Sequence, residues 1–216
     1  MIRLIDINKK YGDKIVYENF NLDVEDNKVL AVLGESGSGK TTLINILAHL
    51  TDAEGRIEGE ITPISIVFQK DRLVPNLTAR ENVTLVNPDA DVDNLFSLLK
   101  LDGQQDNFIK NLSAGMARRV AIARALAYPA PILLLDEPFI NLDVAIKFSI
   151  IKMLKEQQKK SPKTVIFVTH DIKEAANFAD RIIVLKNGKI ACDIKEVSMI
   201  EQTEKKLFAV MMGEEN

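Results

Sequence analysis

Residues 34–42 read Gly34-Glu35-Ser36-Gly37-Ser38-Gly39-Lys40-Thr41-Thr42, which fits the phosphate-loop pattern of Gly, four residues and Gly-Lys-Ser/Thr. An apolar, β-prone run precedes it over 29–33, and an apolar run over 43–48 predicts a helix after it. At such a strand-to-helix turn, glycines let backbone N–H groups converge on phosphates at the helix N-terminus. Lys40 can then reach the β and γ phosphates, and the Thr41 hydroxyl can ligate Mg²⁺. The stretch therefore predicts nucleotide binding by all of residues 34–42, against the alternative of a Gly-rich turn with an incidental lysine.

Composition and charge exclude several classes of protein. The 216 residues are 46% hydrophobic and 27% charged, which is ordinary for a globular domain and argues against disorder. With 28 basic and 31 acidic residues, the net charge of −3 gives no general attraction to nucleic acid or anionic lipid. The longest apolar runs, such as 132–135, are too short to span a bilayer, and the N-terminus does not resemble a secretion signal. We expect a soluble chain.

Cysteine and histidine usage points to a reducing cytoplasm. Cys192 is the single cysteine, which rules out an internal disulfide, and we expect it to be a packing residue. With His49 and His170 as the two histidines, the sequence offers no His/Cys metal cluster.

Alternation and turn residues predict the peripheral elements. Residues 2–7 and 15–24 alternate apolar and polar side chains around a turn at 11–13, which predicts an antiparallel strand pair. Residues 70–112 hold prolines and several Asn and Asp turn formers between short helical patches, which predicts a small helical insert. Ser113 then caps a helix that continues to Pro129 and carries three arginines as its polar side chains, Arg118, Arg119 and Arg124.

Continuous apolar runs predict the strands of a buried parallel sheet. These runs cover 29–33, 64–68, 132–135 and 164–169, and amphipathic helices are expected at 143–160 and 172–179. Strands at 181–185 and 189–193 around an Asn-Gly turn, and a helix over about 199–212, complete the chain. Ligand sites in parallel sheets lie at the carboxyl ends of the strands, so the residues that follow these runs are the candidate site.

Polar residues follow four of the predicted strands. They are Lys40 and Thr41, Gln69, the pair Asp136 and Glu137, and His170. Asp136 is expected beside Thr41 as a direct or indirect Mg²⁺ partner, because a carboxylate complements the metal's charge. Glu137 can orient and polarise a water for in-line attack on the γ-phosphate, and His170 can contact that phosphate or hold the water. The structural alternatives are a polar strand exit for the two carboxylates and an ordinary hydrogen-bonded histidine for His170.

Tyr11 and Ser113 each allow two interpretations. A turn tyrosine such as Tyr11 can stack on an adenine ring or take part in packing, and packing is the commoner outcome. Ser113, at a helix N-terminus, can be a plain N-cap, an anion site, or both.

Residues 112–116, Leu-Ser-Ala-Gly-Met, followed by Arg-Val-Ala-Ile-Ala-Arg-Ala-Leu over 119–126, resemble the signature and signature helix of the ATPase subunits of the ATP-binding-cassette (ABC) family. The resemblance covers nearly the whole chain. It implies an α/β fold with a phosphate-loop NTPase (RecA-like) core, a mainly parallel sheet, a small N-terminal antiparallel β subdomain and an inserted helical subdomain. The expected organisation is one domain over 1–216, with the core and β subdomain at 1–69 and 129–216 and the helical subdomain at about 70–128.

The resemblance also implies roles for individual residues. Tyr11 would stack on adenine, Gln69 would sense Mg²⁺ and couple the two lobes, and His170 would be the switch histidine. Two such domains would sandwich two ATP molecules head to tail, so that Ser113, Ala114, Gly115 and Asp143 act across the dimer. Ala114 departs from the glycine usual in the family, and Arg118 departs from a common glutamine.

Three stretches, 68–83, 136–139 and 169–175, are similar to the nitrate, sulfonate, taurine and pyrimidine-precursor importers, although Asn76 replaces the tryptophan common there. The resemblance therefore implies an ATP- and Mg²⁺-dependent ATPase that powers a membrane transporter, as an importer of a small anion or small organic solute. Its expected partners are a second copy on ATP binding, transmembrane permease subunits docked against 69–82, and a solute-binding protein, with no nucleic acid. Its expected place is the cytoplasm, peripheral on the inner face of the cell membrane.

Two other functions remain open. One is a same-fold ATPase that regulates an envelope or cell-division complex without transport, which the importer-like stretches disfavour. The other is a DNA-maintenance ATPase, which is disfavoured because the segment between Gln69 and Ser113 has no room for a long coiled coil and no basic stripe is evident.

Overall fold

The computed structural model describes residues 1–212, and its centre is a six-stranded sheet in the order β5-β6-β7-β3-β8-β9. The strands are β3 (Val29–Gly34), β5 (Ile64–Val67), β6 (Ile132–Asp136), β7 (Thr164–Thr169), β8 (Arg181–Lys186) and β9 (Lys189–Ile194). All neighbouring pairs are parallel except β8 and β9, which form an antiparallel hairpin. The fold class predicted from the sequence is confirmed.

A second, antiparallel sheet covers one face of the central sheet. It has the order β2-β1-β4, from β1 (Ile2–Tyr11), β2 (Lys14–Val24) and β4 (Glu54–Glu58). The alternation seen in the sequence puts Ile2 and Leu4 of β1 inside, and a register shift between Leu4 and Ile7 brings Ile7 inside as well; all three are at most 2% exposed. These side chains share a core with α1 (Lys40–Leu47) and with Leu30 and Val32 of β3, so α1 lies between the two sheets.

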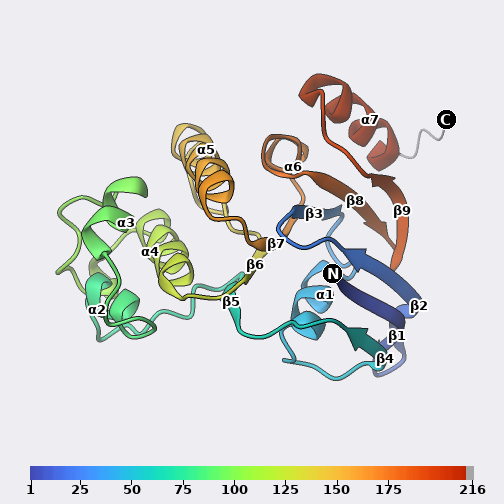
Figure 1. Ribbon diagram of the computed structural model, residues 1–216, viewed down its shortest axis with the longest axis horizontal. Coiled ribbons are helices and arrows are strands. Elements are labelled where there is room, and N and C mark those ends of the chain that lie inside the picture. The colour runs from blue at the N-terminus through green and yellow to red at the C-terminus, as the bar shows by residue number, and fades with distance from the viewer. Residues whose placement is uncertain (213–216) are drawn as a thin grey trace.

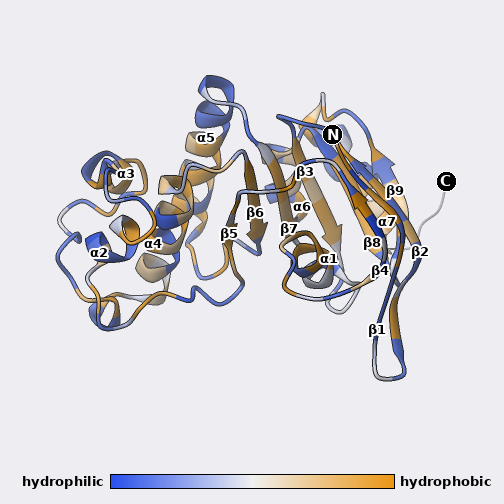
Figure 2. Ribbon diagram, turned by 60° about the horizontal axis from the view of Figure 1, so that its bottom comes forward, coloured by the Kyte–Doolittle hydropathy of each residue, from blue (hydrophilic) through white to orange (hydrophobic). Residues whose placement is uncertain are grey.

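Helices cover the opposite face. Val29, Ala31 and Leu33 of β3 point into a core that includes residues of α4 (Ala114–Ala127), α5 (Val144–Lys160) and α6 (Ile172–Phe178). Figure 2 shows the central strands as mainly hydrophobic ribbons, while the helices around them carry hydrophilic stretches. Burial on both faces explains why these strands read as continuous apolar runs.

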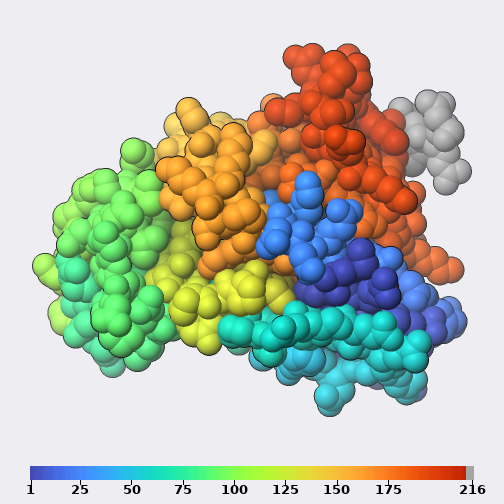
Figure 3. All heavy atoms as spheres, viewed as in Figure 1, coloured from blue at the N-terminus to red at the C-terminus, as the bar shows by residue number. Residues whose placement is uncertain are grey.

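A helical lobe extends from the β5 edge of the central sheet (Figure 1). We define it by α2 (Ala79–Thr84), α3 (Val92–Leu98), a 3-10 turn (Ile109–Asn111) and α4. Thr78 and Glu81 form a capping box that starts α2, and Asp91 caps α3. In the space-filling view the lobe occupies one end of an elongated molecule (Figure 3). The helical insert predicted over 70–112 is thus present as short, individually capped helices.

The C-terminal helix α7 (Ile200–Met212) packs against α6 and β8, above the sheet in Figure 1. Residues 213–216, which the expected single domain includes, lie outside the described residues, and the division of the chain into core and helical subdomains stays a prediction. Among residues 1–212, no helix has the length and apolar character needed to cross a membrane.

Candidate functional site

A cavity of about 750 Å³ lies at the carboxyl ends of the parallel strands. Its lining joins residues that are far apart in the sequence: Tyr11, Lys14, Val16, Glu35, Ser36, Gly37, Gly39, Lys40, Thr41, Thr42, Gln69, Glu137, Ile140, His170 and Met211. The four strand ends expected to meet here are therefore brought together. Gln69 and Glu137 arrive from β5 and β6, which are hydrogen-bonded neighbours, and His170 follows β7.

The loop between β3 and α1 has a backbone that glycine permits. Gly37 has φ 81° and Gly39 has φ 112°, both in the left-handed region that other residues rarely adopt. A Cβ atom on Gly39 would also lie 2.8 Å from the hydroxyl of Tyr17, which donates a hydrogen bond to the Gly39 carbonyl. Ser38 Oγ is buried, and within residues 1–212 it has no hydrogen-bond partner. An unpartnered buried hydroxyl inside this loop fits a phosphate oxygen as its partner.

Lys40 begins α1 and is only 7% exposed. Its Nζ donates to the carbonyl oxygens of Gly34, at 2.8 Å, and Glu35, at 2.9 Å. Burial lowers the pKa of Lys40 below its ordinary value, and the nearby carboxylates of Glu137 and Asp136 offset part of this effect. The cation is thus fixed beside the loop that would hold the phosphates.

Thr41 and Asp136 place two side-chain oxygen atoms next to each other. The Thr41 hydroxyl donates to Asp136 Oδ1 at 3.3 Å, and Asp136 is 3% exposed at the end of β6. Burial raises the pKa of Asp136, while the Thr41 hydroxyl bond and the cations of Arg118 and Lys40 act in the opposite direction. Hydroxyl, carboxylate and the Gln69 amide are hard oxygen donors, which fits Mg²⁺. Among residues 1–212 there is no cluster of three or more His, Cys, Asp or Glu that could hold a metal.

Glu137 has an unusual backbone and a paired side chain. Its φ of 50° is left-handed, and its N–H donates to the Val168 carbonyl at 3.0 Å. Its carboxylate oxygens lie 2.9 and 3.1 Å from His170 Nδ1. The Glu137 side chain is 13% exposed and that of His170 is 68% exposed, so the pair reaches from the sheet edge to solvent. This arrangement suits a base whose orientation is held by a histidine.

Tyr11 lies at the end of β1 and is 49% exposed. Lys9 Nζ lies 4.8 Å from the centroid of its ring, so one contact of the ring is cationic. The ring is thus half covered by protein, which is compatible with partial packing and leaves a face open, and stacking on adenine stays a prediction.

The residues expected to act across a dimer lie outside the cavity lining. Ser113 Oγ accepts a bond from the Met116 N–H, so its N-cap role is confirmed. Asp143 caps α5 in the same way, and Ala114 is exposed at the start of α4. A Cβ atom on Gly115 would lie 2.8 Å from the carbonyl oxygen of Asn141.

Arg118 is the site residue that sequence reasoning missed, because it was counted among the polar side chains of its helix. It is 1% exposed and heads the largest fully buried side chains of residues 1–212. Its position was the available signal: Arg118 lies three, four and seven residues before the buried Ala121, Ile122 and Ala125, on the apolar stripe of α4. Met211 of α7 was also not expected to line the nucleotide cavity.

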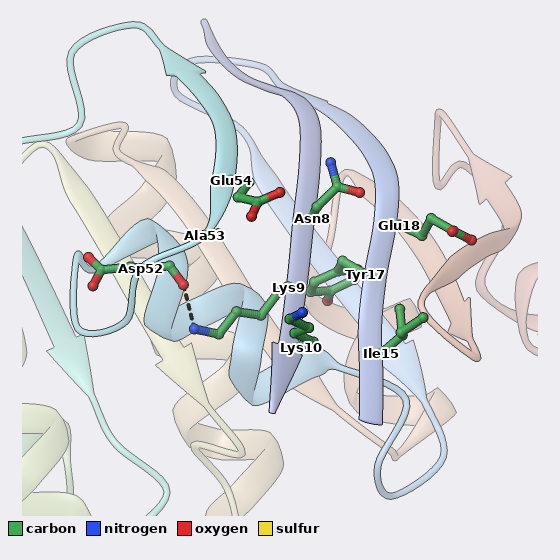
Figure 4. Close-up of a pocket in the computed structure, with 9 residues that line it drawn as sticks. All are labelled: Asn8, Lys9, Lys10, Ile15, Tyr17, Glu18, Asp52, Ala53 and Glu54. Carbon is green, nitrogen blue, oxygen red and sulfur yellow. Dashed lines mark hydrogen bonds between the residues drawn. The ribbon is translucent and has the colours of Figure 1, made fainter. Parts of the chain in front are cut away.

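A second cavity, of about 410 Å³, lies on the antiparallel sheet and is drawn in Figure 4. Its Lys9 Nζ donates to the Thr51 hydroxyl at 2.7 Å and to the carbonyl of Asp52, the bond dashed in Figure 4. Because these protein oxygens already bind that cation, we assign no ligand to this cavity.

Comparison with known proteins gives consistent findings. Residues 17–140 match the family model described as ABC transporter. The chain is 38% identical to an aliphatic sulfonates import ATP-binding protein of Paraburkholderia xenovorans, covering 96% of this chain and 85% of the relative. It is 36% identical to a spermidine/putrescine import ATP-binding protein of Clostridioides difficile, covering 100% of this chain and 68% of the relative.

Solved structures agree with these sequence matches. The dimeric structure of a bacterial ABC transporter cassette superposes with a TM-score of 0.83 and 33% identity, covering 92% of this chain and 100% of the cassette. A second dimeric structure of that cassette, in a post-hydrolysis state bound to ADP and Pi, has a TM-score of 0.82, 32% identity and the same coverage.

Proposed function

This chain belongs to the ABC transporter family, and we propose that it is the ATP-binding and ATP-hydrolysing subunit of an importer. The observation that carries this proposal is the single cavity lined by Lys40, Thr41, Gln69, Glu137 and His170. These residues supply a phosphate-binding cation, a metal-binding hydroxyl and a paired carboxylate within one site. The relatives named above are import ATP-binding proteins, which supports import over regulation of an envelope complex.

Hydrolysis follows from the charges of the strand ends. The loop N–H groups and Lys40 hold the β and γ phosphates, and Glu137 orients a water for in-line attack. His170, 2.9 Å from the Glu137 carboxylate, keeps that carboxylate in place at the cavity wall. Tyr11 stacks on the adenine at the outer end of the cavity.

Magnesium binding is the part of the site assigned to Thr41, Gln69 and Asp136. The 3.3 Å contact between Thr41 and Asp136 supports a shared ligand set. Mg²⁺ held by these residues would neutralise phosphate charge, and the protein's contribution is to hold the three oxygen donors beside Lys40.

The working form on ATP is a homodimer in which Ser113, Ala114, Gly115 and Asp143 face the partner's nucleotide. Their position outside the cavity of their own chain and the dimeric solved relatives support this arrangement. The dimer docks on transmembrane permease subunits at the inner face of the membrane, and a solute-binding protein delivers a small anion or small organic solute.

The test is the substitution Glu137→Gln, because the amide keeps the shape of the side chain and loses the charge that polarises the water. We expect ATP affinity to stay within a few-fold of wild type, turnover to fall by orders of magnitude, and Mg²⁺-free ATP to trap a dimer. Size-exclusion chromatography with light scattering reads the mass, and phosphate release reads the turnover. A variant that stays monomeric with ATP and hydrolyses normally would contradict the proposed function.

A further inference from the structure

The Arg118 side chain joins three segments of the chain that meet at the edge of the central sheet where the strands end. All five of its N–H groups donate hydrogen bonds. Nη2 donates to the carbonyls of Asp136, at 2.8 Å, and Glu137, at 2.6 Å, and Nε donates to the carbonyl of Pro138 at 2.9 Å. One side chain thus holds three consecutive carbonyl groups around Glu137.

The other guanidinium nitrogen reaches the segment that contains Gln69. Nη1 donates to the Phe68 carbonyl and, at 2.8 Å, to Asp71 Oδ1. Phe68 and Asp71 flank Gln69 in the sequence, and Arg118 itself lies on α4, five residues after Ser113. The buried guanidinium is therefore a bonded link between the helical lobe, the Gln69 segment and the end of β6.

Glu137 needs such support because of its backbone conformation. A left-handed φ at a residue other than glycine costs on the order of 1 kcal/mol and persists only where the surroundings enforce it. The N–H of Glu137 is fixed by Val168, and its carbonyl is fixed by Arg118. With both sides of the residue fixed, the carboxylate is directed toward His170 and the phosphate loop.

We propose that Arg118 is a positioning residue for hydrolysis, which holds the backbone of Glu137 in its catalytic conformation and ties that conformation to the Gln69 segment and the signature helix. This inference rests on the proposed function, since it concerns the same water-activating carboxylate. Removing the guanidinium would also cost stability, because four carbonyl groups and Asp71 would lose their donor, so the tests below separate the effect on kcat from the effect on folding.

The first test compares Arg118→Met, which keeps length and removes every donor, with Arg118→Lys, which keeps the charge and supplies donors from a single point. For Arg118→Met we expect kcat to fall at least about tenfold, toward the ~100-fold loss typical of a misplaced catalytic group, with KM changed less than about threefold. Arg118→Lys should recover part of kcat. If the Met variant does not fold, Arg118→Gln, which keeps two donors, replaces it, and its kcat is compared with that of Arg118→Lys and of wild type.

The matched control is Arg124→Met. Arg124 leaves the same helix and donates to the carbonyls of Asp71 and Arg72, but it has no hydrogen bond to the end of β6. Its kcat should stay within about twofold of wild type even if its thermal stability falls, because the backbone of Glu137 is untouched. An equal loss of kcat in both arginine variants, measured on protein shown to be folded by circular dichroism, would overturn the proposal.

The second test asks whether Arg118 acts through Glu137. In the Glu137→Gln background, adding the Arg118 substitution should change the slow single-turnover rate by less than about twofold, because the carboxylate to be positioned is already gone. If the two substitutions lower the rate independently, so that their fold-losses multiply in the double variant, the proposal is overturned. If wild type hydrolyses ATP and loses this activity in Glu137→Gln while Arg118→Met keeps wild-type kcat, the inference fails and the proposed function stands; absence of hydrolysis in wild type removes the proposed function itself.

Discussion

Ala114 and Gly115 are adjacent at the start of α4 but lie in different surroundings. Ala114 is exposed, so its methyl group meets no close protein neighbour that would exclude it. Gly115 faces the carbonyl of Asn141, and a Cβ atom there would approach it to 2.8 Å. The departure from the family's usual glycine therefore falls on the residue that tolerates a side chain, and the glycine that the packing requires is retained.

At this residue scale, we predict that Gly115→Ala lowers the free energy of unfolding by about 1 to 2 kcal/mol, because either α4 or the 140–142 segment must move away. Ala114→Gly is the matched control and should cost less than about 1 kcal/mol, since it only loosens the first turn of a helix. Urea unfolding measures both. ATP-dependent dimerisation in the Glu137→Gln background should weaken for Gly115→Ala only, and equal effects in the two variants would contradict the contact.

The segment from Gln69 to Asn82 is held as one element by a buried amide. Asn82 is fully buried, and its side chain accepts from the Val74 N–H and donates to the carbonyls of Val74 and Thr78. This bonding fixes the loop and leaves Val74 38% exposed on its surface. A fixed loop beside Gln69 is suited to pass a partner's movement to the nucleotide.

At the element scale, we predict that Val74→Glu abolishes co-purification of the integral membrane subunits with the tagged chain from detergent-solubilised membranes, because it puts a charge on the docking surface. Basal ATP hydrolysis of the isolated chain should stay unchanged. Phe208→Glu on α7, where the side chain is 59% exposed, is the matched control and should co-purify normally. Retention of the membrane subunits by the Val74 variant would show that docking lies elsewhere.

In the whole molecule, the phosphate loop and the residues of the signature lie on separate parts of the fold. The phosphate loop belongs to the core between the two sheets, whereas Ser113 starts α4 in the helical lobe and lies outside the cavity lining. One chain therefore presents the phosphate loop and the signature at different places, and in the proposed dimer a second copy would complete each site.

At the scale of the whole molecule, we predict complementation between two inactive chains. Lys40→Ala removes the cation from both sites of its homodimer, and Ser113→Arg puts bulk and charge in both signatures, so each pure variant should be almost inactive. In a mixed dimer one site collects both lesions and the other has an intact Lys40 and an intact Ser113. The fraction of ATP-dependent dimer, measured by sedimentation, and the rate of phosphate release should both be higher in the mixture than the average of the two pure variants.

The control mixture pairs Lys40→Ala with the double variant Lys40→Ala, Ser113→Arg, in which no intact site can form. At every protein concentration, dimer formation and phosphate release in this control mixture should equal the average of its two components. A Lys40/Ser113 mixture that only equals the average of its components on both readouts would contradict the shared site.

The sequence by itself determined which residues meet at the carboxyl ends of the parallel strands. The phosphate-loop motif, the continuous apolar strands and the polar residues that follow them were sufficient to bring Lys40, Gln69, Glu137 and His170 to one cavity. The physical reason is that parallel strands end at the same edge of a sheet, so a residue's place after its strand predicts its place in the fold. The caps at Ser113 and Asp143 were likewise local signals.

The tertiary structure alone decided which polar side chains lie inside. Three arginines of α4 look alike in the sequence, but only Arg118 meets the carbonyl groups of 136–138 and the Phe68–Asp71 segment. The contact of Gly115 with Asn141 and the position of Met211 at the nucleotide cavity depend in the same way on chain segments far apart in sequence. Local patterns report periodicity and capping, whereas a buried cation is stable only where distant segments supply its acceptors, and those distances are set by the packed fold.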